Sequence, residues 1–172
     1  MVRIDSHTIN RFSMYGLIAL VAFLLQTTVA GSLRLWSVAP SFAVAATILV
    51  GMHAGCQTGA VFGAALGFMC DCTSSFLVGG LAMLLMLVGL LAGILTERTL
   101  WRSLPAAFVL LSATYLGRIL YALIASGAIR MDPGRMVDSI IIYGKECLVT
   151  APWLALFYPV IGFFMRKLEE VE

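Results

Sequence analysis

Residues 51–80 read GMHAGCQTGAVFGAALGFMCDCTSSFLVGG, and they combine a row of glycines with the first acidic residue inside apolar sequence. Every fourth position in the row is a glycine until the row ends on a carboxylate: Gly51, Gly55, Gly59, Gly63, Gly67 and Asp71. Four residues make one α-helical turn plus about 40°, so the row winds slowly along one side of a helix. In a membrane, such a stripe of small residues lets helix backbones approach closely. We therefore expect this helix to be central and its stripe, Gly59, Gly63 and Gly67, to contact other helices.

Asp71 needs a partner in such a place, because a carboxylate at the centre of a bilayer costs at least ~2.5 kcal/mol. Its position in the stripe predicts that it points into the bundle. Glycine and alanine are common in membrane helices in general, which explains any single small-residue pair. Three consecutive steps that end on an acid favour a specific contact.

The composition of the 172-residue chain excludes an ordinary soluble domain, since 61% of the residues are hydrophobic and only 12% are charged. The apolar segments are too long for core helices and do not alternate in ten-residue units, so a helical bundle is favoured over a barrel. We predict an all-α, polytopic membrane protein with six transmembrane helices in a single domain, residues 1–172.

Six apolar segments serve as the expected membrane spans. They lie at about 12–30, 40–53, 57–71, 76–96, 105–126 and 147–165. Residues 127–138 are predicted to form the most polar loop, and Pro152 and Pro159 are predicted to kink the last span. The polar leader and the ending Thr28-Val29-Ala30 also fit a cleavable signal peptide, an alternative to an uncleaved first span.

Six spans place both termini on the same side of the membrane. With a cytoplasmic N-terminus, the inner segments carry six basic residues and the outer segments four: Arg3, Arg11, Arg98, Arg102, Arg166 and Lys167 against Arg34, Arg130, Arg135 and Lys145. Basic residues concentrate in cytoplasmic loops, so we expect both termini in the cytoplasm.

Gln26, Asp71 and Arg118 are predicted to share one layer in the outer leaflet. They lie 14, 14 and 13 residues beyond the expected helix starts at 12, 57 and 105, which is roughly 20 Å along each helix. Opposite charges at equal depth neutralise each other, so we predict an Asp71–Arg118 pair. The alternative is that Arg118 snorkels outward and Asp71 is interfacial. For Gln26, a cap at its own helix end and a hydrogen bond to a neighbouring helix are both open.

The sequence carries no pattern typical of an active site. The four cysteines, Cys56, Cys70, Cys72 and Cys147, form no recognisable disulfide framework. Cys70 and Cys72 with nearby methionines match a soft-metal site for an ion such as Cu(I) only weakly, and we favour small apolar packing for them. A nucleophile with its base, a phosphate-binding glycine loop and zinc-ligand spacing are all missing. We therefore expect no enzyme activity, cofactor, metal or nucleic-acid partner.

The order of several motifs resembles the rod shape-determining protein MreD family over nearly the whole chain. These are Gln26-Thr27-Thr28 at the end of the first span, Pro40 at the start of the second, G-x-x-x-G-A-x-x-G-x-x-x-G-x-x-x-D from Gly55 to Asp71, and Gly79-Gly80. Two departures are Ser41, where the family often has an acidic residue, and the cysteines on either side of Asp71.

The resemblance implies a non-enzymatic, integral component of the bacterial cell-elongation machinery in the cell membrane. Members associate with the bitopic protein MreC and, through it, with the MreB cytoskeleton and the peptidoglycan synthases of lateral wall growth. The family's fold is similar to the six-helix substrate-binding subunit of energy-coupling-factor vitamin transporters, which supplies an alternative function. In a transporter the polar layer lines a ligand cavity, whereas in a scaffold it is filled by protein.

Overall fold

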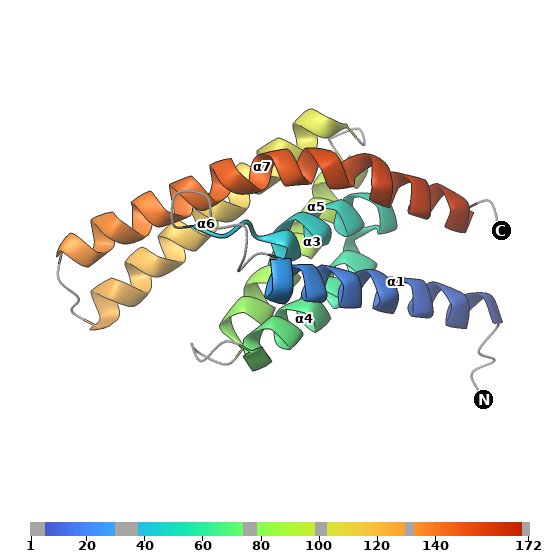
Figure 1. The fold of residues 1–172 in the computed structure, drawn as a ribbon, viewed down its shortest axis with the longest axis horizontal. Coiled ribbons are helices and arrows are strands. Elements are labelled where there is room, and N and C mark those ends of the chain that lie inside the picture. Colours follow the sequence, from blue (N-terminus) through green and yellow to red (C-terminus); the bar gives the residue numbers. More distant parts are fainter. Residues whose placement is uncertain (1–5, 30–37, 74–78, 99–102, 130–132, 170–172) are drawn as a thin grey trace.

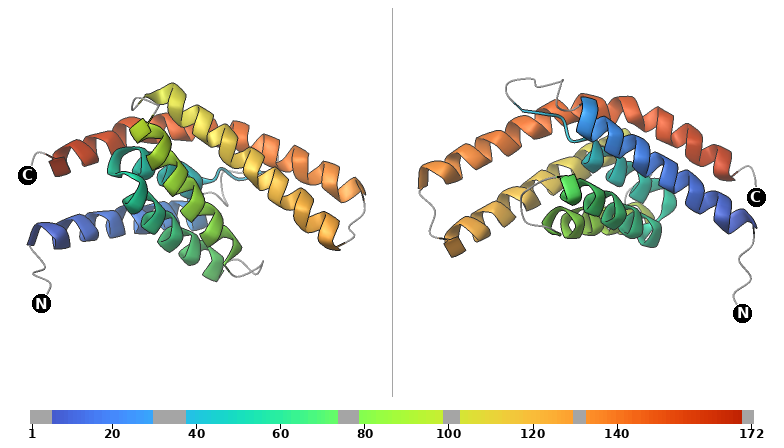
Figure 2. Two further views of the ribbon diagram at one scale, coloured as in Figure 1. Left: turned by 180° about the vertical axis from the view of Figure 1, so that it is seen from behind. Right: turned by 60° about the horizontal axis from the view of Figure 1, so that its bottom comes forward.

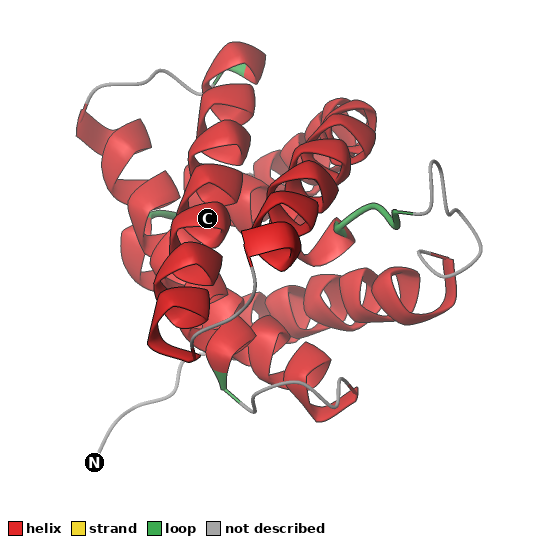
Figure 3. Cartoon of the chain, turned by 90° about the vertical axis from the view of Figure 1, so that its left-hand side faces the viewer, coloured by secondary structure: helices red, strands yellow, loops and turns green. Residues whose placement is uncertain are grey.

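The computed structural model describes residues 6–29, 38–73, 79–98, 103–129 and 133–169. The helices are α1 (Ser6–Leu24), which continues as the π-helix η1 (Leu25–Val29), α3 (Phe42–Ala54), α4 (Cys56–Thr73), α5 (Gly80–Arg98), α6 (Leu104–Ile129) and α7 (Pro133–Glu169). Within these ranges the chain contains no strand (Figure 3). The prediction of an all-α chain with six helices is confirmed.

The shortest of the described α-helices, α3, lies at the centre of the fold. Every residue from Phe42 to Met52 is buried, and α3 contacts each of the other five α-helices (Figure 1). A helix that is apolar on all sides is stable only when it is enclosed. The one hydroxyl in this buried run, on Thr47, donates to the carbonyl of Ala43 at 2.8 Å. The central helix is thus α3.

The expectation that the glycine-striped helix is central was wrong. Helix α4 buries its glycine side, but Val61 and Phe68 on its other side are 61% and 58% exposed. The stripe marks the face through which α4 packs, and large apolar residues mark a face that the bundle does not cover. A stripe of small residues therefore predicts a contact and not a central position.

Helices α4 and α5 form an antiparallel pair that packs on α3 (Figure 2). One residue, Gly55, connects α3 to α4, and its φ of 88° lies in the left-handed region that favours glycine. The predicted spans 40–53 and 57–71 therefore match α3 and α4 to within two residues at each end. Residues 76–78 of the predicted fourth span lie outside the described residues, and α5 begins at Gly80.

Helices α6 and α7 lie side by side and extend together beyond the other helices, to the left in Figure 1. At about 1.5 Å per residue, the 37 residues of α7 measure about 55 Å. The start of α1 and the end of α7 lie at the opposite end of the molecule (Figure 1).

The predicted loop 127–138 was wrong, and the helix that contains the predicted sixth span already begins at Pro133. Residues 127–129 end α6 and residues 133–138 begin α7, while 130–132 lie outside the described residues. Pro133 occupies the first position of α7, where its missing N–H costs no hydrogen bond. Glu146, which precedes the predicted span, lies inside α7 and pairs with Arg118 of α6. Both Pro152 and Pro159 lie within α7, which continues past them.

Two helical segments are long and apolar enough to cross a membrane, Gly80–Glu97 of α5 and Ile140–Phe163 of α7. Three shorter apolar segments accompany them among the described residues: Met14–Val29, Phe42–Ala54 and Leu104–Leu120.

Candidate functional site

A polar cluster between α6 and α7 is the most distinctive group of side chains in the described part of the chain. The guanidinium of Arg118 on α6 donates from Nη1 to Oε1 of Glu146 on α7 at 2.8 Å. Their side chains are 19% and 14% exposed. Because both charges are largely withdrawn from solvent, each needs the other to offset the cost of its own desolvation.

Two tyrosines flank the ion pair. The Arg118 guanidinium carbon lies 5.6 Å from the ring centroid of Tyr115 and 5.0 Å from that of Tyr143. Each tyrosine is three residues before a charged residue on its own helix, so it shares that residue's face. The electron-rich ring faces attract the cation and stabilise the pair further.

Thr150 connects this cluster to the start of the central helix. Its hydroxyl donates to the carbonyl of Glu146 at 2.7 Å, one turn earlier. Its Oγ1 accepts from the backbone N–H of Ser41 at 3.0 Å and lies 3.1 Å from the Tyr115 hydroxyl. Since the single Thr150 hydrogen is committed to Glu146, the Tyr115 hydroxyl is the donor to Thr150. One hydroxyl thus joins α3, α6 and α7.

The predicted pair of Asp71 and Arg118 was wrong. The carboxylate that meets Arg118 belongs to Glu146, whereas Asp71 accepts hydrogen bonds at the start of α5. Counting residues from helix starts estimates depth in the membrane, but it does not say which side of a helix faces which neighbour.

Asp71, which is 3% exposed, caps the helix that follows it. Its Oδ2 accepts from the backbone N–H groups of Gly79 at 3.0 Å and Ala82 at 3.1 Å. The first N–H groups of a helix have no partner within the helix, and a carboxylate there also interacts favourably with the helix dipole.

Glu97 performs the reciprocal function at the other end of the same pair. It lies near the end of α5, and its Oε1 accepts from the backbone N–H of Cys56, the first residue of α4, at 3.4 Å. Each helix of the α4–α5 pair therefore carries near its end a carboxylate that caps the start of its partner.

Gln26 hydrogen-bonds to a neighbouring helix, the second of the two alternatives for this residue. Its Oε1 accepts from the backbone N–H of Ala43 in the first turn of α3 at 3.2 Å. Gln26 lies in the π-helical turn η1. Ala43 is close in the chain to Ser41, which contacts Thr150. Gln26 and the Arg118 cluster therefore both contact the start of α3. Asp71, the third residue of the predicted layer, contacts the start of α5 instead.

The three stripe glycines each face the backbone of another helix. A Cβ added at Gly59 would lie 2.6 Å from the Gly51 Cα of α3 and 2.7 Å from the Gly89 carbonyl oxygen of α5. At Gly67 it would lie 2.5 Å from the Cα of Ala82. At Gly63 it would collide with the carbonyl oxygen of Leu85. Even one methyl group has no room at these positions.

The two cysteines beside Asp71 lie on different faces of α4, because Cys70 is buried and Cys72 is exposed. Met83 and Met86, the methionines considered with them, are 71% and 44% exposed. The described residues contain no group of three or more His, Cys, Asp or Glu side chains arranged to hold a metal ion.

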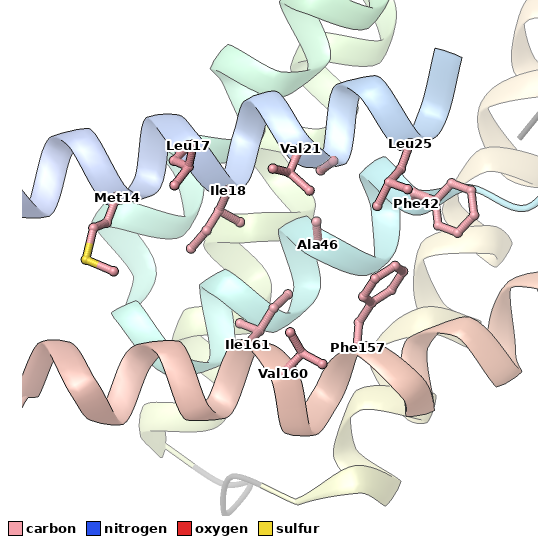
Figure 4. A pocket seen from close by; sticks show the side chains of 11 residues that line it. Met14, Leu17, Ile18, Val21, Leu25, Phe42, Ala46, Phe157, Val160 and Ile161 are labelled. Atoms are coloured by element: carbon pink, nitrogen blue, oxygen red, sulfur yellow. The ribbon is translucent and has the colours of Figure 1, made fainter. Parts of the chain in front are cut away.

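An apolar groove lies between α1 and α7, with α3 as its floor (Figure 4). Its volume is about 210 Å³. All the residues that line it are apolar: Met14, Leu17, Ile18, Val21, Ala22, Leu25, Phe42, Ala46, Phe157, Val160 and Ile161.

Comparisons of the chain with family models, curated proteins and solved structures gave no match. The polar cluster joins helices and satisfies its own members: among the described residues, every buried side-chain nitrogen or oxygen has a hydrogen-bond partner. Such an arrangement fixes the position of helices.

Three residues of the cluster were not predicted from the sequence: Tyr143, Glu146 and Thr150. They recur at three- and four-residue spacing on one face of α7, which was the available signal. Tyr143 and Glu146 lie before the predicted start of the last span at 147, and Thr150 lies after it, so the predicted boundary separated them.

Proposed function

We propose that the chain is a multi-pass protein of the bacterial cell membrane that acts as a non-enzymatic scaffold of the cell-elongation machinery, as the MreD family does. In this proposal the six helices span or enter the bilayer with both termini in the cytoplasm. An MreC-like bitopic protein is the direct partner, and the MreB cytoskeleton and peptidoglycan synthases are indirect partners.

The proposal is supported by the contacts of the glycine-rich motif between Gly55 and Asp71, which resembles the MreD family. Gly59, Gly63 and Gly67 face the backbones of α3 and α5 without room for a side chain. Asp71, at the end of the same motif, caps α5. Close backbone contact and buried polar caps suit a bundle in lipid, where apolar side chains gain little by leaving one hydrocarbon environment for another.

The partners of the polar side chains favour the scaffold over the vitamin-transporter alternative. Gln26, Asp71 and Arg118 each contact another part of the protein. The groove between α1 and α7 presents only apolar side chains. A site for a polar small molecule needs a few polar groups directed into a cavity, and this groove offers none.

Copurification from native membranes tests the function most broadly. The tagged chain is extracted in mild detergent, and the bound proteins and small molecules are identified by mass spectrometry, with a tagged unrelated membrane protein as the control. We expect a bitopic MreC-like protein in stoichiometric amount. Recovery of ATPase subunits together with a vitamin would contradict the scaffold and support the transporter.

Cysteine labelling of intact cells tests the proposed orientation. In a variant without the four native cysteines, Asp132→Cys at the α6–α7 connection should react with an impermeant maleimide. A cysteine added after Glu172 should react only after the membrane is opened. Labelling of the C-terminal position from outside would overturn the orientation.

A further inference from the structure

We propose that the groove between α1 and α7 is a binding site for one acyl chain of a membrane phospholipid. The inference depends on the membrane location proposed above, but it is independent of the MreC-like partner and of any function in wall growth.

The apolar lining of the groove favours a hydrocarbon ligand. Its floor is formed by Phe42 and Ala46 of α3, which are 2% and 6% exposed, and its walls are apolar residues of α1 and α7 (Figure 4). A head group, a sugar or a nucleotide would leave its polar atoms unpaired there, at a considerable cost in free energy. Only an apolar ligand meets no such penalty.

The dimensions of the groove match one acyl chain. Along α1 it extends from Met14 to Leu25, which is about 16 Å of helix. One leaflet of the hydrocarbon core is about 15 Å thick, half of the ~30 Å total. An apolar cavity of about 150 Å³ holds a benzene molecule, so about 210 Å³ accommodates a length of hydrocarbon chain.

The same dimensions disfavour a helix as the occupant. A helix with its side chains is about 10 Å across, so a 16 Å length fills on the order of 1,000 Å³. The groove and the open space above it together hold about 760 Å³, which is less than such a helix needs. A partner helix would lie over the groove and not inside it.

The rims of the groove connect it to surfaces available to lipid. On α1, Leu17 and Val21 are 56% and 48% exposed, and on α7 Val160 is 48% exposed. These rims lie within the apolar segments Met14–Val29 and Ile140–Phe163. An acyl chain of the bilayer therefore enters sideways without leaving hydrocarbon.

Photolabelling in lipid nanodiscs tests the proposal. The discs contain phosphatidylcholine with a diazirine on its acyl chain, and the labelled residues are mapped by peptide mass spectrometry. We expect labelling to concentrate on the groove residues Ala22 and Ala46, above the level on the exposed α6 residues Val109 and Leu116.

Two variants fill the groove in different ways. Ala46→Phe fills it from the floor, and Val21→Trp fills it from the exposed rim, where folding is not at risk. Each should lower groove labelling at least about fivefold, because a close-packed groove has no space for a chain. Ala113→Phe, on the exposed side of α6, is the matched control and should leave groove labelling unchanged.

The outcomes separate this proposal from the membrane location. Labelling of Val109 and Leu116 with none in the groove would overturn the acyl-chain site and leave the membrane location intact. Even labelling of all apolar surfaces, unchanged by Val21→Trp, would also overturn it. Protection of the groove by a copurified protein helix would assign it to a protein partner instead. Failure of the chain to enter the discs would overturn both.

Discussion

The α4–α5 pair and the α6–α7 pair are both antiparallel, but they associate by opposite means. In the first pair, backbones meet: a side chain at Gly59, Gly63 or Gly89 would collide with main-chain atoms of a neighbouring helix. In the second pair, Gly117 and Gly144 have open space where a Cβ would stand. There the helices are joined through long side chains, with Arg118 bound to Glu146.

This difference determines how each pair tolerates change. Backbone contact fails when any atom is added, because main-chain atoms cannot move aside independently. A side-chain contact fails when one partner is removed, because the other charge is stranded away from water. Glycine spacing alone therefore identifies only one of the two kinds of helix contact.

The largest effect is expected for Gly63→Leu. The added atoms meet the backbone of Leu85, so the penalty should exceed the ~1–3 kcal/mol usual for an overpacked core. We expect severe loss of folded protein, measured as membrane abundance and as thermal stability in detergent. Val61→Leu on the exposed side of α4 and Gly117→Leu on α6 should both be tolerated. Equal loss at Gly117 would remove the distinction between the two pairs.

Removal of one charge from the α6–α7 cluster should have the next largest effect. Arg118→Gln leaves Glu146 without its cation, at a typical cost of about 3–5 kcal/mol for a buried pair. The free energy of unfolding in detergent measures this loss. The control is Ser112→Ala, which removes an exposed hydroxyl that bonds only the carbonyl of Phe108 one turn earlier. A loss no larger than that of the control would show that the ion pair is not needed to join α6 and α7.

Asp71→Ala should destabilise the α4–α5 pair moderately. It removes the acceptor for the N–H groups of Gly79 and Ala82, and loss of such a cap costs about 0.5–2 kcal/mol. Hydrogen exchange should increase first at the start of α5. Cys72→Ala, at the exposed neighbouring position, should leave that exchange unchanged. Increased exchange spread evenly over all helices would contradict a local capping function.

Gln26→Leu should have the smallest effect. It leaves the Ala43 N–H without its acceptor, at about 1 kcal/mol. The matched control is Gln57→Leu, at an exposed position of α4. The two variants are compared by thermal unfolding, and an equal shift in both would mean that the cap on α3 does not contribute to stability.

The sequence predicted those parts of the fold that depend on spacing along one helix. The four-residue glycine row identified the face through which α4 packs, and the hydrophobic segments gave six helices. The central position of α3 could not be predicted in the same way, because an all-apolar helix has no polar face to indicate its orientation.

The polar contacts were predicted less well, for a physical reason. Depth along a helix follows from residue number, but pairing also depends on rotation of each helix about its axis. Asp71 and Arg118 have similar predicted depths, yet their partners are the start of α5 and Glu146. Glu146 was missed because a charged residue lowers local hydropathy, which placed the start of the last helix after it.

A pair of double-mutant cycles tests most directly the central claim that α6 and α7 are joined through Arg118 and Glu146. Unfolding free energies are measured for the wild type, for the single variants Arg118→Gln, Glu146→Gln and Asp71→Asn, and for the two double variants that combine Arg118→Gln with Glu146→Gln or with Asp71→Asn. The account predicts a coupling energy of about 2 kcal/mol for Arg118 with Glu146, and additivity within about 0.5 kcal/mol for Arg118 with Asp71. Coupling to Asp71 with additivity for Glu146 would contradict it.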